Sequence, residues 1–164
     1  MADSIEFALE GIDGLVGKLE AISYDMKRKG GRSALRKAAQ VVANKVKEGA
    51  DRLDDPESKE RIADNVAIRW SGRTFKATGD LRFRVGILGG AGSKSKAGAY
   101  DDLPGGDTRH WRLLEFGTSK MAAQPFMRKA LADNISEATS TFITEYEKAI
   151  DRAIKRAAKA AGST

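Results

Sequence analysis

The stretch that decides the fold is His110–Leu131, which reads HWRLLEFGTSKMAAQPFMRKAL. Its first part, Trp111–Phe116, is mostly apolar, and we interpret it as a core strand. Gly117 permits a positive φ, so the chain can turn abruptly after the apolar run. Pro125 presets φ for a first helical turn and has no amide that needs a partner there, which predicts that Phe126–Leu131 opens a helix.

This stretch does not contain a reaction centre. Glu115 and His110 are five residues apart, with no second carboxylate, nucleophile or glycine-rich phosphate loop near them. General acid–base chemistry needs at least two groups in defined geometry, and the sequence supplies no such pair. We therefore predict no catalytic residues and no cofactor, and the protein is not expected to be an enzyme.

The same run resembles the hallmark of a bacteriophage family of minor tail components, the tail-completion or neck proteins of long-tailed phages. In that family an aromatic-rich strand ends in E-F-G-T, which is followed by S-K, then by Q-P-F and a helix. Only Leu81–Leu131 resembles the family in detail, and the rest of the plan is similar more loosely. The matching motif positions are Glu115, Phe116, Gly117, Thr118, Ser119, Lys120, Gln124, Pro125 and Phe126.

The resemblance implies a virion structural protein that completes the top of the tail or joins the tail to the head connector, without catalysis. Its implied partners are further copies of itself in a ring and the tail terminator, tail tube or head connector proteins. Its implied location is the tail or neck of the virion, after synthesis in the host cytoplasm. Glu115, taken from the E-F-G-T element, is read as a structural acid that accepts hydrogen bonds near the turn.

Length and composition set further limits. The 164 residues predict a single domain over 1–164, and 41% apolar with 32% charged residues is typical of a soluble protein. No apolar run approaches a membrane helix, and no secretory leader is recognised, so we expect no membrane partner and folding in the cytoplasm. There is no cysteine and a single histidine, which makes a zinc or transition-metal site improbable.

A net charge of +6 raises one alternative function, a small basic nucleic-acid-binding protein. Arg82 and Arg84 would supply the cations, with Trp70, Trp111 and Tyr100 as stacking groups. The 29 basic residues are, however, interleaved with 23 acids, and the clusters on predicted helices are typical of solvated faces. DNA contact is thus possible but not favoured from the sequence.

The remaining pattern predicts an α+β fold, with a small, mostly antiparallel sheet, helices packed on one face and a long C-terminal helix. Alternating apolar residues predict strands at Ser4–Glu10, Asn65–Trp70 and Leu81–Leu88, with Ser71–Asp80 as a turn or hairpin loop. Helical spacing predicts one helix from Leu15 to about Lys29, ended by Gly30-Gly31, and a second from Ser33 to about Asp54. One further helical turn is expected at Ser58–Ile62. The apolar face of the C-terminal helix is predicted to contain Leu131, Ile135, Phe142, Tyr146, Ile150 and Ile154.

Between the last two predicted strands lies Gly89–Arg109, which is rich in Gly, Ala, Ser, Lys and Asp and has no periodicity. So long a segment without structure is either functional or disordered, and its few large apolar groups cannot offset the entropy cost of ordering it. We predict a flexible loop that orders on assembly. Its candidate assembly residues are Ser93, Lys94, Lys96, Tyr100, Asp101 and Leu103.

Overall fold

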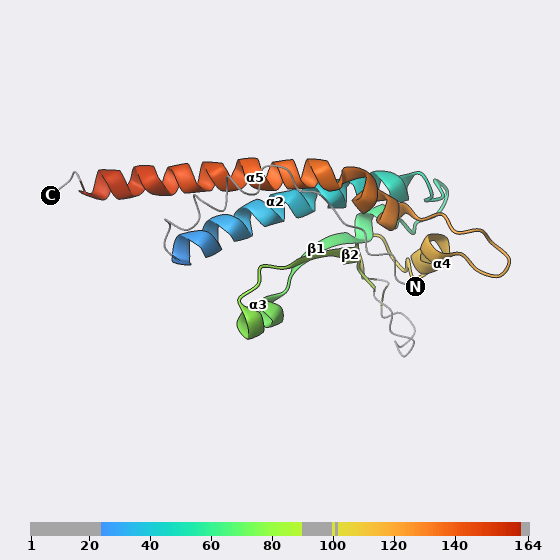
Figure 1. Ribbon diagram of the computed structural model, residues 1–164. Helices are drawn as coiled ribbons and strands as arrows, with labels where there is room; N and C mark the ends of the chain where they lie inside the picture. Colours follow the sequence, from blue (N-terminus) through green and yellow to red (C-terminus); the bar gives the residue numbers. More distant parts are fainter. Residues whose placement is uncertain (1–23, 90–99, 101, 162–164) are drawn as a thin grey trace, which may run out of the picture. The chain divides into compact units, whose positions relative to one another are not determined.

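The structure is a computed structural model that describes residues 24–89, 100 and 102–161. These residues form a mostly helical α+β fold with a two-stranded antiparallel sheet (Figure 1), which confirms the predicted fold class. The predicted strand Ser4–Glu10 and the beginning of the predicted helix at Leu15 lie outside the described residues. The elements are α2 (Tyr24–Asp51), the 3-10 turn η1 (Ala63–Asn65), β1 (Val66–Trp70), α3 (Gly72–Thr78), β2 (Phe83–Ile87), α4 (Trp111–Phe116) and α5 (Phe126–Ala161).

The chain divides into two compact units. Residues 1–38 and 136–164 form one unit, here called the helical unit, and residues 39–135 form the other, the mixed unit. The helices α2 and α5 each run from one unit into the other. Among the described residues, the helical unit contains only parts of these two helices, whereas the mixed unit contains the sheet and the motif region.

In the helical unit, a glycine lets α2 approach an aromatic ring. A Cβ atom on Gly30 would lie 3.1 Å from the Tyr146 ring and 3.2 Å from the Ala149 Cβ. Tyr146 packs there with Ala34 and Ile150 in a small buried cluster. The prediction that Gly30-Gly31 ends a helix is therefore wrong, because the close packing stabilises α2 by more than the roughly 1 kcal/mol that a glycine costs in a helix.

The same unit contains an ion pair at its surface. The Lys37 ammonium binds the Glu145 carboxylate, and Lys148 donates a second hydrogen bond to the same carboxylate at 3.1 Å. Hydrogen bonds from Lys37 and then Lys148 lower the pKa of Glu145 below its usual value. Because the pKa is lowered in the folded state, the stabilisation is present above the usual pKa and is lost as the pH falls through the lowered one.

In the mixed unit, β1 and β2 pair antiparallel, with Ile68 opposite Val85 and Trp70 opposite Phe83. Both strands lie inside the ranges predicted from alternation, so these two predictions are confirmed. Their connection was expected to be a turn or loop, but Gly72–Thr78 forms the helix α3. Phe75 on α3 packs against the Trp70 ring, with centroids 5.5 Å apart, and this contact stabilises a helix too short to persist alone.

The flexible loop predicted at Gly89–Arg109 extends too far toward its C-terminal end, because the residues there are fixed to the core. Thr108 is buried, and the buried side chain of Asn65 donates to its hydroxyl at 2.7 Å. The Asn65 amide also donates to the Gly106 carbonyl and accepts from the Gly105 amide, both at 2.9 Å. This set of hydrogen bonds, here called the Asn65 tether, fixes the segment to the core. The candidate loop residues Ser93, Lys94, Lys96 and Asp101 lie outside the described residues.

The turn expected at Ser58–Ile62 is replaced by an irregular approach to η1. The Asp54 carboxylate accepts hydrogen bonds from the amides of Ile62, at 2.9 Å, and Ala63, at 3.2 Å. Because the Asp54 side chain supplies acceptors for these amides, they do not need the carbonyl groups of a preceding helical turn. Ile62 and Ala63 are thereby held in the core of the mixed unit.

The C-terminal helix α5 begins directly after Pro125, as predicted, and contains 36 residues. Two residues assigned to its buried face are in fact exposed: Leu131 by 49% and Ile154 by 54%. A four-residue spacing follows one ridge of a helix, and Leu131 does not lie on the ridge that is buried, whereas Ile154 continues this ridge beyond its last buried residue, Ile150. The buried residues of α5 recur at multiples of four; they are Phe126, Ala130, Ala138, Tyr146 and Ile150.

We predict that Gly30→Leu destabilises the protein by about 1–3 kcal/mol, because a larger side chain must displace the Tyr146 ring. The matched control is Ser33→Leu, at an exposed position of the same helix, which is expected to change stability by no more than about 0.5 kcal/mol. Urea unfolding followed by circular dichroism measures both values. Equal stability of the two variants would show that the Gly30 contact is not tight.

Candidate functional site

The motif region begins with α4, which is a helix and not the strand predicted at Trp111–Phe116. Its inward residues are Trp111, Leu114 and Glu115, spaced i, i+3 and i+4, whereas a strand would have buried every second residue. The apolar residues Leu113 and Phe116 therefore face outward. The sequence contains a helical signal here, because Trp111 and Leu114 are three residues apart and so are Leu113 and Phe116.

Glu115 joins α4 to the first turn of α5. Its carboxylate accepts hydrogen bonds from the backbone amides of Met127, at 2.9 Å, and Arg128, at 3.1 Å. The Arg128 guanidinium adds one bond to the carboxylate at 3.0 Å and one to the Glu115 carbonyl at 2.7 Å. Glu115 is 1% exposed. We call this set of contacts the Glu115 clasp; it has the hydrogen bonds expected of a structural acid.

The clasp works because free amides and a partial positive charge gather at a helix N-terminus. A negative side chain placed there satisfies amides that have no partner within the helix. Pro125 precedes the first turn and contributes no amide of its own. Glu115 thus acts as a cap supplied by a residue ten or more positions earlier in the chain, and its charge is compensated although it is buried.

Gly117 makes the turn that closes the clasp. Its φ is 73°, as predicted, and its amide donates to the Leu113 carbonyl at 2.8 Å, which ends α4. A Cβ atom at Gly117 would lie 2.7 Å from the Ala123 amide nitrogen and 2.9 Å from the Met121 carbonyl oxygen. The Gln124 amide then donates to the Leu114 carbonyl at 2.7 Å, so the chain returns beside α4.

The other motif residues divide into turn and surface positions. The Thr118 hydroxyl accepts hydrogen bonds from the amides of Lys120, at 3.2 Å, and Met121, at 3.1 Å. Thr118, Ser119 and Lys120 are exposed, whereas Phe126 is buried. A Cβ atom on Gly49 of α2 would lie 3.1 Å from the Phe126 Cβ, so the motif is anchored on a close helix contact within the mixed unit.

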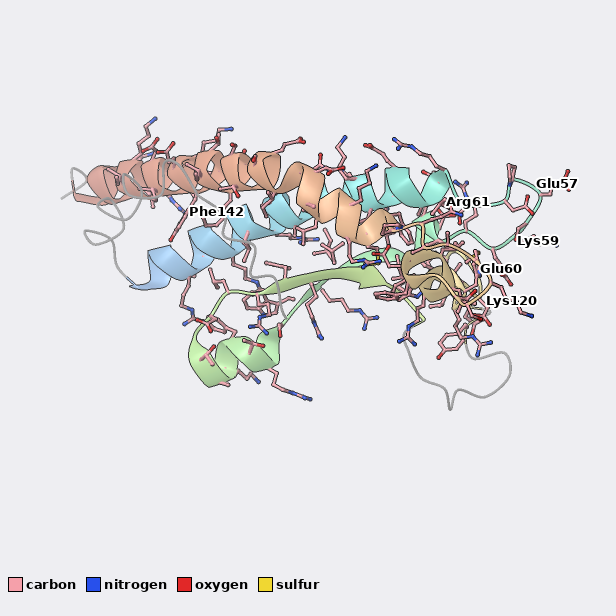
Figure 2. All side chains as sticks on the ribbon, turned by 45° about the vertical axis from the view of Figure 1, so that its right-hand side comes forward. Glu57, Lys59, Glu60, Arg61, Lys120 and Phe142 are labelled. Carbon is pink, nitrogen blue, oxygen red and sulfur yellow. The ribbon has the colours of Figure 1, made fainter. Side chains whose placement is uncertain are left out.

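An exposed apolar face lies on the outer side of α4. Leu113 is 52% exposed and Phe116 is 61% exposed. We call these two residues the α4 apolar face. They border an open hollow that also contains His110 and Glu60, whose imidazole nitrogen and carboxylate oxygen are 3.8 Å apart; Figure 2 labels Glu60. Two large apolar side chains side by side on one short helix are typical of an interaction surface.

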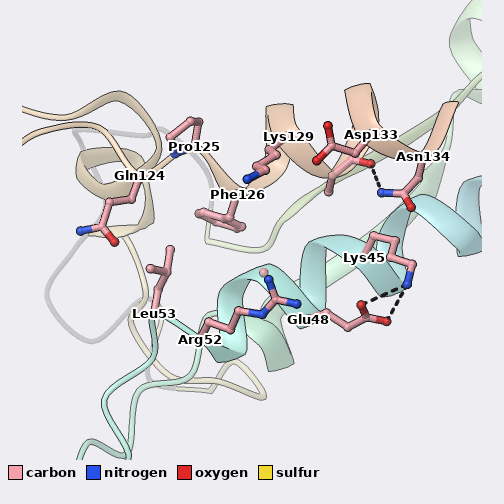
Figure 3. Close-up of a pocket in the computed structure, with 12 residues that line it drawn as sticks. Lys45, Glu48, Arg52, Leu53, Gln124, Pro125, Phe126, Lys129, Asp133 and Asn134 are labelled. Carbon is pink, nitrogen blue, oxygen red and sulfur yellow. Dashed lines mark hydrogen bonds and ion pairs between the residues drawn. The ribbon is translucent and has the colours of Figure 1, made fainter.

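A second hollow of about 500 Å³ lies where α2 ends and α5 begins, within the mixed unit (Figure 3). Its apolar lining includes Leu53, Pro125, Phe126 and Ala130. Charged residues also line it, and they are Lys45, Glu48, Arg52, Lys129 and Asp133. We call it the α2–α5 hollow. It differs in shape and chemistry from the α4 apolar face.

The two faces of the sheet also differ. Trp70 and Phe83 lie opposite each other with ring centroids 5.1 Å apart, on the face away from Arg82 and Arg84. The proposed stacking set is therefore not on the arginine face. Its other members are placed elsewhere, because the Trp111 indole nitrogen is buried and the Tyr100 ring lies 5.0 Å from the Arg109 guanidinium.

The part of the chain that the structure describes contains no group of three or more His, Cys, Asp or Glu residues that could hold a metal ion. Within the same part, no helix is both long enough and apolar enough to cross a membrane. The described residues thus offer a capped helix, two dissimilar hollows and a cationic sheet face.

The comparisons place this chain among bacteriophage tail components. A family model described as "Bacteriophage HK97-gp10, putative tail-component" matches residues 13–117. The chain therefore belongs to the HK97 gp10-like family of phage tail components. No curated protein and no solved structure matches the chain. The family match confirms the resemblance inferred from the motif; it ends at Gly117 and does not extend to Gln124-Pro125-Phe126.

We predict that Glu115→Gln destabilises the protein by about 2–3 kcal/mol, because the neutral amide offers one acceptor oxygen and turns an NH₂ group toward backbone donors. The control Arg128→Gln keeps both amide bonds to the carboxylate and removes the guanidinium, which contacts the Glu115 carboxylate, the Glu115 carbonyl and the Phe116 ring. Because this side chain is 60% exposed, the change should cost about 1 kcal/mol. Chemical denaturation measures both. A larger loss in the Arg128 variant would mean that the ion pair, and not the helix cap, holds the clasp.

A second prediction concerns the turn. Gly117→Val is expected to cost at least about 1–3 kcal/mol, since a β-branched residue is strained at φ 73° and its Cβ would meet two backbone atoms. Gly79→Val also occupies a positive φ, of 79°, but with nothing within 4 Å of the added Cβ. The difference between the two melting temperatures isolates the backbone clash. Equal melting temperatures would contradict it.

Proposed function

We propose that the protein is a non-enzymatic virion structural protein that completes the top of the phage tail or joins the tail to the head connector, as a ring of identical subunits. The observation that carries this proposal is the family match over residues 13–117. The tail terminator, the tail tube and the head connector are the proposed partners. The virion tail or neck is the proposed location.

The surfaces of the mixed unit support a ring. A closed ring of identical subunits needs two different surfaces that fit each other, because each subunit contacts its neighbour head to tail. The α4 apolar face offers Leu113 and Phe116 as protruding side chains, and the α2–α5 hollow offers an apolar lining with charged residues around it. We propose that these two surfaces meet between neighbouring subunits.

The Glu115 clasp supports the same proposal. An assembly surface that keeps its shape before the partner arrives binds more tightly, since ordering a surface on binding reduces affinity. Glu115 is part of α4 and is bound to α5, so the outward direction of Leu113 and Phe116 is fixed in the free subunit. The candidate assembly loop around Ser93–Asp101 is proposed as an additional contact.

We predict that Leu113→Asp combined with Phe116→Asp leaves the protein folded but blocks assembly. Charged groups in a desolvated interface weaken each subunit contact at least about tenfold, since a central apolar side chain contributes about 2 kcal/mol or more. The test is complementation of a phage that lacks the gene, with electron microscopy of the particles. Unjoined or incomplete tails are the expected result.

The matched control is Leu131→Asp, because Leu131 is exposed to a similar degree, 49%, on a different helix of the mixed unit. It should yield infectious particles at the wild-type level. Normal particles from the double variant would disprove the role of the α4 apolar face. Absence of the wild-type chain from purified virions would disprove the structural function as a whole.

A further inference from the structure

One strand–helix–strand segment of this chain has several basic residues and almost no acid. Between Val66 and Leu88, the strand–helix–strand segment contains five basic residues and one acid, so it carries +4 of the net charge of +6. The single acid, Asp80, accepts a hydrogen bond from the Thr78 hydroxyl at 2.7 Å. The basic residues are Arg69, Arg73, Lys76, Arg82 and Arg84, and all five are exposed.

Three of these cations share one face of the sheet. Arg69 lies directly opposite Arg84. Arg82 lies two residues before Arg84 along the same extended backbone, so the two side chains are on the same face. The hydrogen bonds from Leu88 to Asn65 and from Ser71 to Arg82 make Arg69 and Arg84 a hydrogen-bonded pair, whose Cα atoms lie about 5.5 Å apart. Side chains at Arg82 and Arg84 repeat about every 6.7 Å along the strand. We call Arg69, Arg82 and Arg84 the arginine face.

Within the described part of the chain, no acid pairs with the arginine face. Among the residues that the structure describes, none of the three guanidinium groups forms an ion pair. Like charges directly opposite each other on a sheet are destabilising, so repulsion between Arg69 and Arg84 lowers the stability of the folded protein. An external anion would remove that cost, so the arrangement favours a bound polyanion.

The surface beside the arginines is open. The next pair along the sheet on the same face is Ala67 opposite Gly86, and a Cβ atom on Gly86 would meet nothing within 4 Å. A hollow of about 290 Å³ lies there, lined by both of these residues and by Arg69 and Arg84. A ligand can therefore reach the sheet backbone while arginine side chains flank it.

The chemistry of this face favours nucleic-acid phosphate over an acidic protein. A protein interface is anchored by large apolar side chains, and those of this sheet, such as Trp70 and Phe83, lie on the other face. The neighbours of the arginines are small residues, Ala67, Gly86 and Ser71. Arginine binds phosphate through two parallel hydrogen bonds, and a row of cations about 6 Å apart suits a repeating backbone charge.

We propose that the arginine face binds the phosphate backbone of double-stranded DNA without sequence preference. Its cations contact phosphate, and contacts to phosphate fix the position of a protein on the duplex without reading its sequence. One subunit with three such contacts binds weakly, with a dissociation constant in the range of about 10⁻⁴–10⁻⁶ M that is typical of non-specific complexes. This inference is independent of the proposed assembly role, because the α4 apolar face does not include these residues.

The test is fluorescence anisotropy of a short labelled duplex titrated with the full chain, at salt concentrations between about 50 and 200 mM. Binding is expected to weaken with a slope of log K against log salt of about −3, from about −0.9 for each neutralised phosphate. The variant Arg69→Gln/Arg82→Gln/Arg84→Gln should bind at least about tenfold more weakly and lose most of the slope. A melting curve should show it to be as stable as the wild type or more so, since the repulsion is removed.

The control removes the same charge elsewhere. Arg152→Gln/Lys155→Gln/Lys159→Gln lies on an exposed part of α5 and should retain wild-type binding and slope. Equal losses in the two triple variants would overturn the proposal, because net charge alone would then explain binding. Absence of wild-type binding at low salt would also overturn it. If the triple variant fails to fold, Arg84→Gln alone, with an expected change of about one unit in the slope, gives the same decision.

A competition experiment decides between the two polyanion classes. Poly-glutamate, added at equal charge to the labelled complex, is expected to displace duplex DNA poorly, because duplex DNA carries one charge per about 1.7 Å of its axis and an extended polypeptide only about one per 3.3 Å. Tighter binding of poly-glutamate than of DNA would overturn the proposal in favour of an acidic protein partner. Failure of any of these measurements leaves the tail-component proposal intact, since that proposal is tested by particle assembly.

Discussion

The structure of the mixed unit depends on one buried charge. Glu115 is enclosed, and a carboxylate without donors in such a place would cost several kcal/mol. The first turn of α5 supplies two amides and a favourable dipole, so the acid and the helix end must be together. Once this contact forms, the position of α4, the tight return at Gly117 and the start of α5 are all determined, because the connecting loop has little freedom left.

A second buried polar group, the Asn65 side chain, holds a segment that contains no helix or strand in position. A two-stranded sheet is marginal by itself, and it needs neighbours to hold its end in place. The Asn65 side chain binds Gly105, Gly106 and Thr108 through three hydrogen bonds. Gly105 fits closely there, since a Cβ atom at that position would overlap the Arg61 carbonyl oxygen. Polar contacts between distant positions thus replace the larger apolar core that a bigger sheet would provide.

These contacts explain which parts of the fold were predictable from sequence. The strands at Val66–Trp70 and Phe83–Ile87 follow from local alternation, and the start of α5 follows from Pro125, because both signals act within a few residues. The strand prediction at α4 was wrong because six residues form fewer than two helical turns, so the three-residue spacings of their apolar side chains are a weak helical signal. The continuity of α2 through Gly30 depends on Tyr146, more than a hundred residues later, and no local rule contains that contact.

The candidate site was predictable to a similar extent. Glu115 could be assigned as a structural acid from the motif, but its donors at Met127 and Arg128 could not be identified until the return of the chain was known. Arg82 and Arg84 were noticed from their alternation, whereas Arg69 was not, because only the strand register places it opposite Arg84. Trp70 lies on the other face because side-chain direction alternates along a strand. Trp111 lies on α4, and Tyr100 lies beside Arg109.

The arginine face and the proposed ring also bear on each other. Three phosphate contacts in a single subunit are weak and sensitive to salt, so one subunit would release DNA readily. In a closed ring the same face is repeated around the axis, and each further contact is made at a high effective concentration once the first has formed. Because the contacts are electrostatic and independent of sequence, they would permit DNA to slide past them. The loss of folding free energy from repulsion at the Arg69–Arg84 pair is then small compared with the binding free energy that the repeated surface gains.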